Sequence, residues 1–378
     1  MKTNTPSNTI KTSFLAAAVV AALAITLAYR AEADDTNTAT GIGALHSNTF
    51  GTNNTADGFK ALYSNTTGSY NTASGVQALY ANTTGYANTA SGEGALYANT
   101  TENDNTANGT QALHSNTTGS YNSANGYYAL LYNTTGNGNT ANGTYVLLYN
   151  TTGNVNTANG YRALQSNTTG IQNAADGYMS LYSNTTGNSN TANGTRALYS
   201  NTTGNVNTAM GYLADVTSGA LTNATAIGYN AKVNASNKIR LGITAVTRIE
   251  GQVPWSSTSD KRLKNHITDL PLGLDFITQL RPVEYIRNNN AAKTKEWGII
   301  AQELQQTLKK MDYKGAGIVE EDSSPEKHMT VRYTDLIAPL IKSVQEQEKT
   351  ILNQEKINQE QQKIIMALMK RIEALEKK

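Results

Sequence analysis

Residues 75–91 read Gly-Val-Gln-Ala-Leu-Tyr-Ala-Asn-Thr-Thr-Gly-Tyr-Ala-Asn-Thr-Ala-Ser, and close variants of this stretch recur through most of the first 250 residues. The glycine that opens the stretch returns every 17 residues, at Gly41, Gly58, Gly75, Gly92, Gly109, Gly126, Gly143, Gly160, Gly177, Gly194, Gly211 and Gly228. A strict period is interpreted as one structural unit before any local structure is considered. Seventeen residues are too few for two helices and a turn, and Thr, Tyr and alternating small residues favour strands. The repeat therefore predicts a mainly β fold, a β-solenoid with one coil per repeat.

Within each unit, the recurrent apolar positions are an Ala-Leu pair and a later Ala, for example Ala78, Leu79 and Ala90. We expect these side chains to line the interior. The Asn-Thr-Thr-Gly stretch at 82–85 predicts a turn, because Asn and Gly tolerate positive φ, and Asn88 marks a second corner. Twelve coils stacked about 4.8 Å apart would form a rod of about 55 Å.

One Leu and two Ala per coil make a thin apolar core. A solenoid with so little apolar area would struggle to offset the entropy lost on ordering its backbone. Lateral association of three chains would add a second core between them. The repeat therefore favours a homotrimer, with the chain itself as its own partner.

Two further features of the repeat have competing interpretations. The many Asn-x-Thr triplets match the glycosylation acceptor pattern, but composition alone produces them in an Asn/Thr-rich repeat. Tyr recurs at one position directly after Leu, at Tyr63, Tyr80, Tyr97, Tyr182 and Tyr199. Such a ladder either packs along a solenoid face, which we favour, or stacks on a glycan or another cell-surface ligand.

Composition excludes several classes of protein. The 378 residues carry a net charge of +2 and no Cys, so disulfides, zinc-thiolate sites and cysteine nucleophiles are excluded. The mild charge argues against a nucleic-acid partner, which usually requires a basic stripe. The four His residues show no ligand spacing, and no cofactor or metal is predicted. The repeats also lack the paired acidic residues of a glycosidase, so no external substrate is predicted.

Charge divides the chain. Residues 34–250 hold 7 Lys/Arg and 9 Asp/Glu, whereas residues 259–378 hold 20 and 18. We therefore expect a solenoid over 34–250, a junction over 251–258, a small α+β domain over 259–336 and a coiled coil over 337–378.

The N-terminus predicts an export signal over residues 1–33. Lys2 and Lys11 precede an apolar run at 14–28, which is short for a membrane span, and the small-x-small site at 31–33 follows. We expect cleavage after Ala33, which leaves no membrane span, although a retained anchor is the alternative. The expected location is extracellular or at the cell surface, with passage through the periplasm.

The C-terminal residues show six heptads in phase. Position a is occupied by Ile337, Val344, Ile351, Asn358, Ile365 and Ile372, and position d by Leu340, Gln347, Gln354, Gln361, Leu368 and Leu375. This pattern predicts a coiled coil, and the β-branched a residues fit two or three strands. The polar middle layers would fix register and number, and we favour a trimer.

The repeats resemble the heads of trimeric autotransporter adhesins. The residues that carry the resemblance lie at 222–233 (Thr-Asn-Ala-Thr-Ala-Ile-Gly-Tyr-Asn-Ala-Lys-Val) and 237–242 (Asn-Lys-Ile-Arg-Leu-Gly). The resemblance implies a trimeric, left-handed β-roll. The upstream repeats depart from it, with Ala-Leu where that family has Ala-Ile-Gly.

Three C-terminal stretches resemble the intramolecular chaperone domain of endosialidases, peptidase family S74. They are 259–267 (Ser-Asp-Lys-Arg-Leu-Lys-Asn-His-Ile), 280–285 (Leu-Arg-Pro-Val-Glu-Tyr) with 297–303 (Trp-Gly-Ile-Ile-Ala-Gln-Glu), and 331–340 (Val-Arg-Tyr-Thr-Asp-Leu-Ile-Ala-Pro-Leu). The resemblance implies a tail that trimerises the chain and then cuts itself off between Thr258 and Ser259.

In that interpretation, Ser259 is the nucleophile and Lys264 is its base, a Ser-Lys dyad. Lysine serves as a base only when neutral, and the charges of Lys261 and Arg262, with burial in a trimer, would favour the neutral amine. Asp260 would oppose this by stabilising the ammonium. Gln302 and Asp260 are candidates for an orienting or oxyanion role.

The simpler alternative is that Ser259 caps a turn and Lys264 is a solvated charge. The sequence therefore predicts an exported, adhesin-like homotrimeric fibre that is matured by an autoproteolytic chaperone tail. The alternative function is a structural fibre whose tail trimerises the chain and is never cut.

Overall fold

The computed structural model describes residues 36–246, 248–252, 256–288, 293–314, 317–321 and 327–376. The predicted export signal lies outside the described residues, as do residues 253–255 of the predicted junction. The chain separates into two compact units, residues 1–243 and residues 244–378, and each is described by itself.

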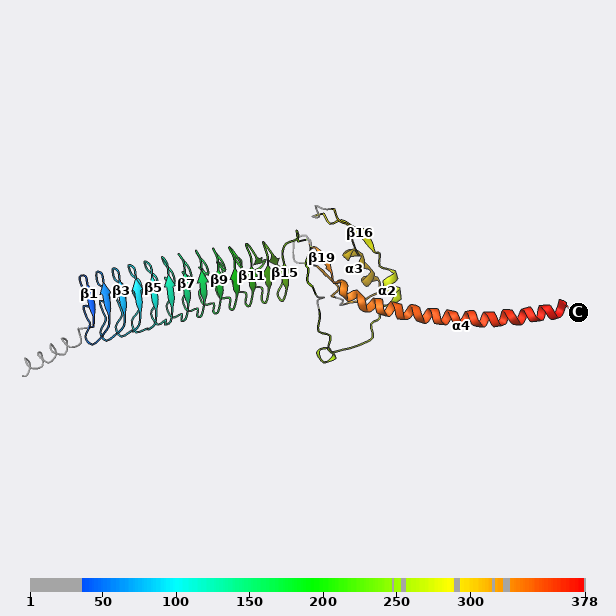
Figure 1. Ribbon diagram of the computed structural model, residues 1–378, viewed down its shortest axis with the longest axis horizontal. Helices are drawn as coiled ribbons and strands as arrows, with labels where there is room; N and C mark the ends of the chain where they lie inside the picture. Colours follow the sequence, from blue (N-terminus) through cyan, green and yellow to red (C-terminus); the bar gives the residue numbers. More distant parts are fainter. Residues whose placement is uncertain are drawn as a thin grey trace, which may run out of the picture. The chain divides into compact units, whose positions relative to one another are not determined.

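The first unit is a β-solenoid, as predicted, and Figure 1 shows its coils as a regular row of short parallel arrows. Each coil contributes one strand to a 13-stranded parallel sheet. The strands are β1 (Thr38–Thr40), β2 (Thr55–Asp57), β3 (Thr72–Ser74), β4 (Thr89–Ser91), β5 (Thr106–Asn108), β6 (Ser123–Asn125), β7 (Thr140–Asn142), β8 (Thr157–Asn159), β9 (Ala174–Asp176), β10 (Thr191–Asn193), β11 (Thr208–Met210), β13 (Thr225–Ile227) and β15 (Ile239–Leu241). Residues 17 apart are paired in register, for example Ala73 with Ala90, whereas the last pair, Thr225 with Ile239, is 14 apart.

The predicted apolar positions line the interior. Ala78, Leu79 and Ala90 are fully buried, and their counterparts form continuous ranks along the solenoid. In the strands, the central Ala points inward and its two neighbours point outward, because successive side chains of a strand alternate between faces. Leu79 reaches the interior with φ of 51°, a left-handed conformation that costs about 1–2 kcal/mol and is offset by burial of its side chain.

Two ranks of asparagine also lie inside; the predicted turn at 82–85 is present, but the positive φ given as its reason is not. Neither Asn82 nor Gly85 takes positive φ, although the chain bends at the two threonines between them. The Asn82 amide instead turns inward, where it donates to the Gly85 carbonyl (3.0 Å) and to Asn65 Oδ1 of the preceding coil (2.8 Å). One rank comprises Asn65, Asn82, Asn99, Asn116, Asn133, Asn150, Asn167, Asn184 and Asn201.

The second rank contains Asn54, Asn71, Asn88, Asn105, Asn122, Asn139, Asn156, Asn173, Asn190 and Asn207, all almost fully buried. Asn88, which was predicted at a corner, donates to Asn71 Oδ1 (3.2 Å) and to the Glu102 carbonyl (2.7 Å). Since hydrogen bonds offset the cost of removing buried polar groups from water, these amides can fill the coil. The interior is therefore less thin than its apolar residues alone indicate, and the argument for a trimer depends mainly on the C-terminal helix.

The glycine that opens each coil is required by both conformation and space. Gly126 has φ of 142°, and a Cβ there would lie 2.3 Å from the Gly143 carbonyl oxygen. Gly138 has φ of 64°, and its Cβ would meet only Val155 Cγ2 at 3.8 Å. The strict period of the first glycine thus reflects close approach of adjacent coils.

We expect Gly126→Ala to lower the free energy of unfolding by about 3 kcal/mol or more, because the backbone of the next coil must shift. Gly138→Ala should cost about 1 kcal/mol, the strain of a left-handed residue alone. Circular dichroism melting of the two variants makes the comparison. Equal losses would contradict this account of the glycine rank.

The tyrosine ladder packs along the solenoid. The rings of His46, Tyr63, Tyr80, Tyr97 and His114 form one stack with centroids 4.9–5.3 Å apart and nearly parallel planes. Tyr182 and Tyr199 stack in the same way. Because the inner rings have a neighbour on each face, a sugar has no free ring face to stack on there. This geometry supports the packing interpretation. The buried Asn of the Asn-Thr-Thr triplets are likewise inaccessible as glycan acceptors in the folded coil.

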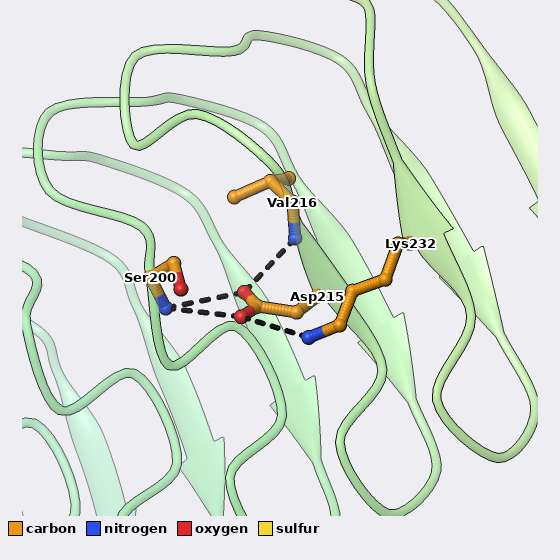
Figure 2. Close-up of polar contacts among 4 residues, drawn as sticks. All are labelled: Ser200, Asp215, Val216 and Lys232. Carbon is orange, nitrogen blue, oxygen red and sulfur yellow. Dashed lines mark hydrogen bonds and ion pairs between the residues drawn. The ribbon is translucent and has the colours of Figure 1, made fainter. Parts of the chain in front are cut away.

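The leucine rank ends at a buried carboxylate. Asp215, in β12 (Asp215–Val216), occupies the position held by Leu198 in the preceding coil, and its side chain is 4% exposed. Figure 2 shows its contacts: the backbone N–H groups of Ser200 (3.1 Å) and Val216 (2.9 Å), and Lys232 Nζ (3.3 Å). Lys232 begins β14 (Lys232–Val233), which pairs with β12. These bonds satisfy the charge where the leucines stop.

The second unit contains short helices and hairpins around a small core, which fits the predicted α+β domain. Its elements are the 3-10 turn η1 (Lys261–Leu263), α2 (Leu274–Thr278), β16 (Val283–Tyr285), β17 (Glu296–Gly298), α3 (Ala301–Lys310), β18 (Val319–Glu321), β19 (Met329–Val331), the 3-10 turn η2 (Tyr333–Leu336) and α4 (Ile337–Glu376). β16 pairs with β17, and β18 with β19, both antiparallel. The core contains Leu272, Phe276, Leu304, Leu308 and Ile318.

Helix α4 is a single helix of 40 residues that begins at Ile337. The helix packs on α2, and its buried residues, Pro339 and Ser343, lie in its first turns. The predicted a and d side chains of the same turns, such as Leu340 and Val344, are exposed. Within the described ranges, no helix combines the length and apolarity needed to cross a membrane.

Candidate functional site

The structure brings the two predicted dyad residues into contact. Asp260 has extended backbone, and the single turn η1 follows it, after which the Lys264 N–H donates to the Lys261 carbonyl (3.1 Å). This tight turn reverses the chain, so that the side chain five residues after Ser259 returns to it. Lys264 Nζ donates to Ser259 Oγ over 2.6 Å.

Asp260 and Arg262 form a pair of their own. The Asp260 carboxylate accepts from the Arg262 backbone N–H (2.8 Å), which caps η1, and from its guanidinium (2.6 Å). These hydrogen bonds from Arg262 lower the pKa of Asp260, so the carboxylate stays ionised. The charges of Asp260 and Arg262 are paired with each other, so neither has the effect on Lys264 that the sequence predicted. The expected repulsion from Arg262 is offset, and Asp260 is not paired with the Lys264 amine.

The chemistry available to this pair is acyl transfer. A serine hydroxyl becomes nucleophilic when an adjacent base takes its proton, and a neutral lysine amine within hydrogen-bond distance is such a base. Both side chains are exposed in the single chain. Loss of water around the amine would favour its neutral form, and the described chain by itself does not bury this amine.

Gln302, the third predicted site residue, lies elsewhere. It is exposed on the first turn of α3, and among the described residues no hydrogen bond joins it to Ser259 or Lys264. Two contacts hold the surroundings of α3: Arg281 pairs with Glu303, and the Ile299 N–H donates to the Tyr333 hydroxyl (3.1 Å). The second and third predicted stretches thus meet in the core of the unit, whereas the first forms its own exposed turn.

Two hydrogen bonds that the sequence did not predict connect α4 to the start of α2 and the segment before it; we call them the clamp. Gly273 precedes α2 and provides no capping side chain, and Glu346 instead accepts from the Leu274 N–H over 2.7 Å. Lys342, one turn earlier, donates to the Leu270 carbonyl. The i, i+4 spacing of Lys342 and Glu346 is visible in the sequence, but their partners 72 residues away are not. The clamp ties the long helix to the segment that packs on the small core.

Among the described residues, no three His, Cys, Asp or Glu side chains lie close enough together to hold a metal ion.

The fold and the Ser-Lys contact define a class of protein: a β-solenoid followed by a small domain with an N-terminal Ser-Lys turn and a long exposed helix. Residues 259–313 match the family described as chaperone of endosialidase, peptidase S74. The C-terminal unit is therefore similar to the chaperone-of-endosialidase family over a stretch that begins at Ser259. The match includes the first two predicted stretches and ends before the third. No curated protein matches the chain.

Proposed function

We propose that the chain is the precursor of an exported homotrimeric fibre, and that its C-terminal unit is an intramolecular chaperone that trimerises the solenoid and then cuts itself off. The observation that carries the proposal is the 2.6 Å contact between Lys264 Nζ and Ser259 Oγ at the first residue of the family match. If Lys264 were only a solvated charge, we would not expect its amine to contact the Ser259 hydroxyl across a tight turn. The contact favours the dyad over the simpler turn-capping alternative.

The proposed cut is an acyl shift followed by hydrolysis. The neutral Lys264 amine takes the Ser259 hydroxyl proton while Oγ attacks the Thr258 carbonyl carbon. The Thr258–Ser259 C–N bond then breaks, and the leaving Ser259 amine receives the proton from the lysine. Water hydrolyses the resulting ester, which gives a Thr258 carboxylate and restores the Ser259 hydroxyl. The products are the solenoid and a fragment of residues 259–378.

Trimerisation is proposed to begin at α4. Its heptad side chains are exposed in the single chain, including Ile351, Ile365, Leu368 and Ile372. Covering this apolar seam with two further copies removes it from water, and helix pairing is local and therefore fast. The clamp of Glu346 on the Leu274 N–H would pass the alignment from α4 to the core. Removal of the tail then leaves a fibre that is kinetically trapped.

Export is proposed from the N-terminal sequence together with the kind of domain found. The apolar run at 14–28 and the site at Ala33 fit a removed signal. A solenoid without Cys also does not depend on the redox state of its compartment. We propose that the mature fibre is extracellular or attached to the cell surface.

Intact-mass measurement of the purified chain tests the cut. The proposal expects a product that ends at Thr258 and a 120-residue fragment that begins at Ser259. A chain that retains residues 259–378 after complete assembly would instead support the uncut structural fibre.

The trimer is tested by two adjacent residues of α4. Ile365 at position a and Met366 at position b are both exposed in the single chain, at 54% and 61%. We expect Ile365→Asp to abolish the trimer, because three carboxylates would face one another in the seam, whereas Met366→Asp leaves it intact. Sedimentation equilibrium of both variants in the Ser259→Ala background measures the mass. A monomeric wild type, or an equal effect of both changes, would refute the seam.

A further inference from the structure

The solenoid carries an aromatic cluster that is distinct from the stacked ladder. It comprises Tyr127, Tyr128, Tyr145, Tyr161, Arg162 and Tyr178, which we call the Tyr-Arg cluster. These residues follow the opening glycine of four successive coils. Tyr127, Tyr161 and Tyr178 are 41%, 37% and 45% exposed, so the cluster faces solvent.

Ring contacts hold the cluster in one arrangement. Tyr127 stacks on Tyr128 at 3.9 Å, and both meet the edge of Tyr145 at 5.6–5.7 Å. Tyr161 contacts Tyr145 edge-on at 6.1 Å and stacks on Tyr178 at 5.5 Å. The Arg162 guanidinium lies 5.7 Å from the Tyr145 ring centre and 5.1 Å from that of Tyr161. Rigid tyrosines around an arginine lose little entropy on binding, which makes such groups frequent hot spots of recognition.

Arg162 makes no ion pair with any residue that the structure describes. It is the only charged residue between Asp104 and Asp176. Its Nε is buried and has no hydrogen-bond partner, and the same holds for Oε1 of Gln165, a side chain that is 8% exposed. An unpaired donor and an unpaired acceptor thus occur three residues apart in one coil.

In another coil, the arginine at the equivalent position contacts an aromatic ring of its own coil. Arg196 corresponds to Arg162 two repeats later, and its guanidinium lies over the ring of Tyr199, 5.3 Å from the centre. Tyr199 occupies the position that Gln165 has in the coil of Arg162. The coil that contains Arg162 has no aromatic ring at that position, and the Arg162 guanidinium lies against the rings of the Tyr-Arg cluster instead.

The groups next to the cluster are neutral donors and acceptors. Asn125, Asn142 and Asn159 each precede an opening glycine, and their amides form a ladder with 2.8 Å steps. A hydrogen bond with Tyr128, loss of water and the neighbouring Tyr145 hydroxyl raise the pKa of Tyr127 to about 12. Its hydroxyl therefore remains a proton donor throughout the physiological range.

We propose that the Tyr-Arg cluster binds an acidic saccharide, with Arg162 contacting its carboxylate or sulfate and the tyrosine and asparagine groups contacting its hydroxyls. The isolated positive charge of Arg162 favours an anion, and the surrounding hydroxyls, amides and aromatic edges suit a polyhydroxylated sugar ring. This site adds a ligand to the proposed fibre and does not depend on the cut at Thr258.

The experiment uses the full chain and three probes with one backbone: dextran, carboxymethyl-dextran and dextran sulfate, measured by biolayer interferometry at physiological salt. We expect binding to at least one acidic probe and none to dextran, and the two acidic arms identify the preferred anion. Arg162→Gln should weaken the binding by about tenfold or more, since charge-assisted hydrogen bonds are lost. Arg196→Gln removes the same charge from the same position of another coil and should change it less than about twofold.

Melting temperatures within a few degrees of wild type show that both variants are folded. If the two changes weakened binding equally, binding would depend on net charge alone, and the proposed site would be wrong. Absence of binding to both acidic probes would also overturn it. Neither result bears on the cut, which intact mass decides separately.

Discussion

Ser259→Ala is expected to leave the chain uncut at full length, where the unaltered chain yields a product that ends at Thr258. Without the hydroxyl no ester forms, so cleavage should slow by about 10⁶-fold, the scale for loss of a serine nucleophile. Lys264→Ala should do the same, because the base 2.6 Å from Ser259 Oγ is lost. Electrophoresis over time, with the N-terminal sequence of the fragment, provides the measurement.

Two further residues are matched controls. Ser257→Ala removes an exposed hydroxyl two residues before Ser259, and Lys309→Ala removes an exposed amine from α3. Both variants should be cut at the wild-type rate. If Ser257→Ala also blocks cleavage, or if the fragment does not begin at Ser259, the assignment of the nucleophile is wrong. If Lys264→Ala is cut normally, another base must act.

Asn122→Asp is expected to be the most damaging single change in the solenoid at neutral pH. Asn122 is 1% exposed, and its amide donates to the Gly136 carbonyl (2.9 Å) and to Asn105 Oδ1 (3.2 Å). A carboxylate cannot donate, so it would place a buried negative charge against two acceptors. We expect the free energy of unfolding to fall by about 4 kcal/mol or more, as for other unpaired buried charges.

Asn125→Asp is the control, three residues further along the same coil. Asn125 is half-buried on the outer face, and Asp57 and Asp176 already occupy the equivalent position of other coils. A carboxylate there should cost less than about 1 kcal/mol. Chemical denaturation of both variants makes the comparison, and similar losses would show that the inner asparagines are replaceable.

The cost of Asn122→Asp should depend on pH. Burial raises the pKa of the new carboxyl in the folded state above its unfolded value of about 3.9. The folded state then binds the proton more readily, so stability is regained as pH falls through the folded pKa. The protonated carboxyl can donate once more to Gly136. A loss that stays constant from pH 7 to pH 4 would contradict this explanation.

The sequence was least informative about the direction in which a side chain points. Asn-Thr-Thr-Gly is a turn signal by composition, and the chain does bend there, but the asparagine points inward. Its partners are the Gly85 carbonyl and Asn65 of another coil, and only the second lies 17 residues away. Local propensity contains no information about such a distant partner. The same limit explains Gln302, which the motif placed with the dyad and the structure places at an exposed position of α3.

The sequence by itself determined the 17-residue coil, the apolar interior positions, the change of character near residue 250 and the heptads of the long helix. These follow from period and composition, which geometry converts directly into coils and helical faces. Only the tertiary structure decided that Lys264 contacts Ser259, that Arg262 pairs with Asp260, that asparagines fill the coils and that the buried Nε of Arg162 has no hydrogen-bond partner among the described residues. Those outcomes depend on which side chains meet across a turn or between coils, and contacts of that kind arise only when the folded backbone brings the groups within about 3 Å.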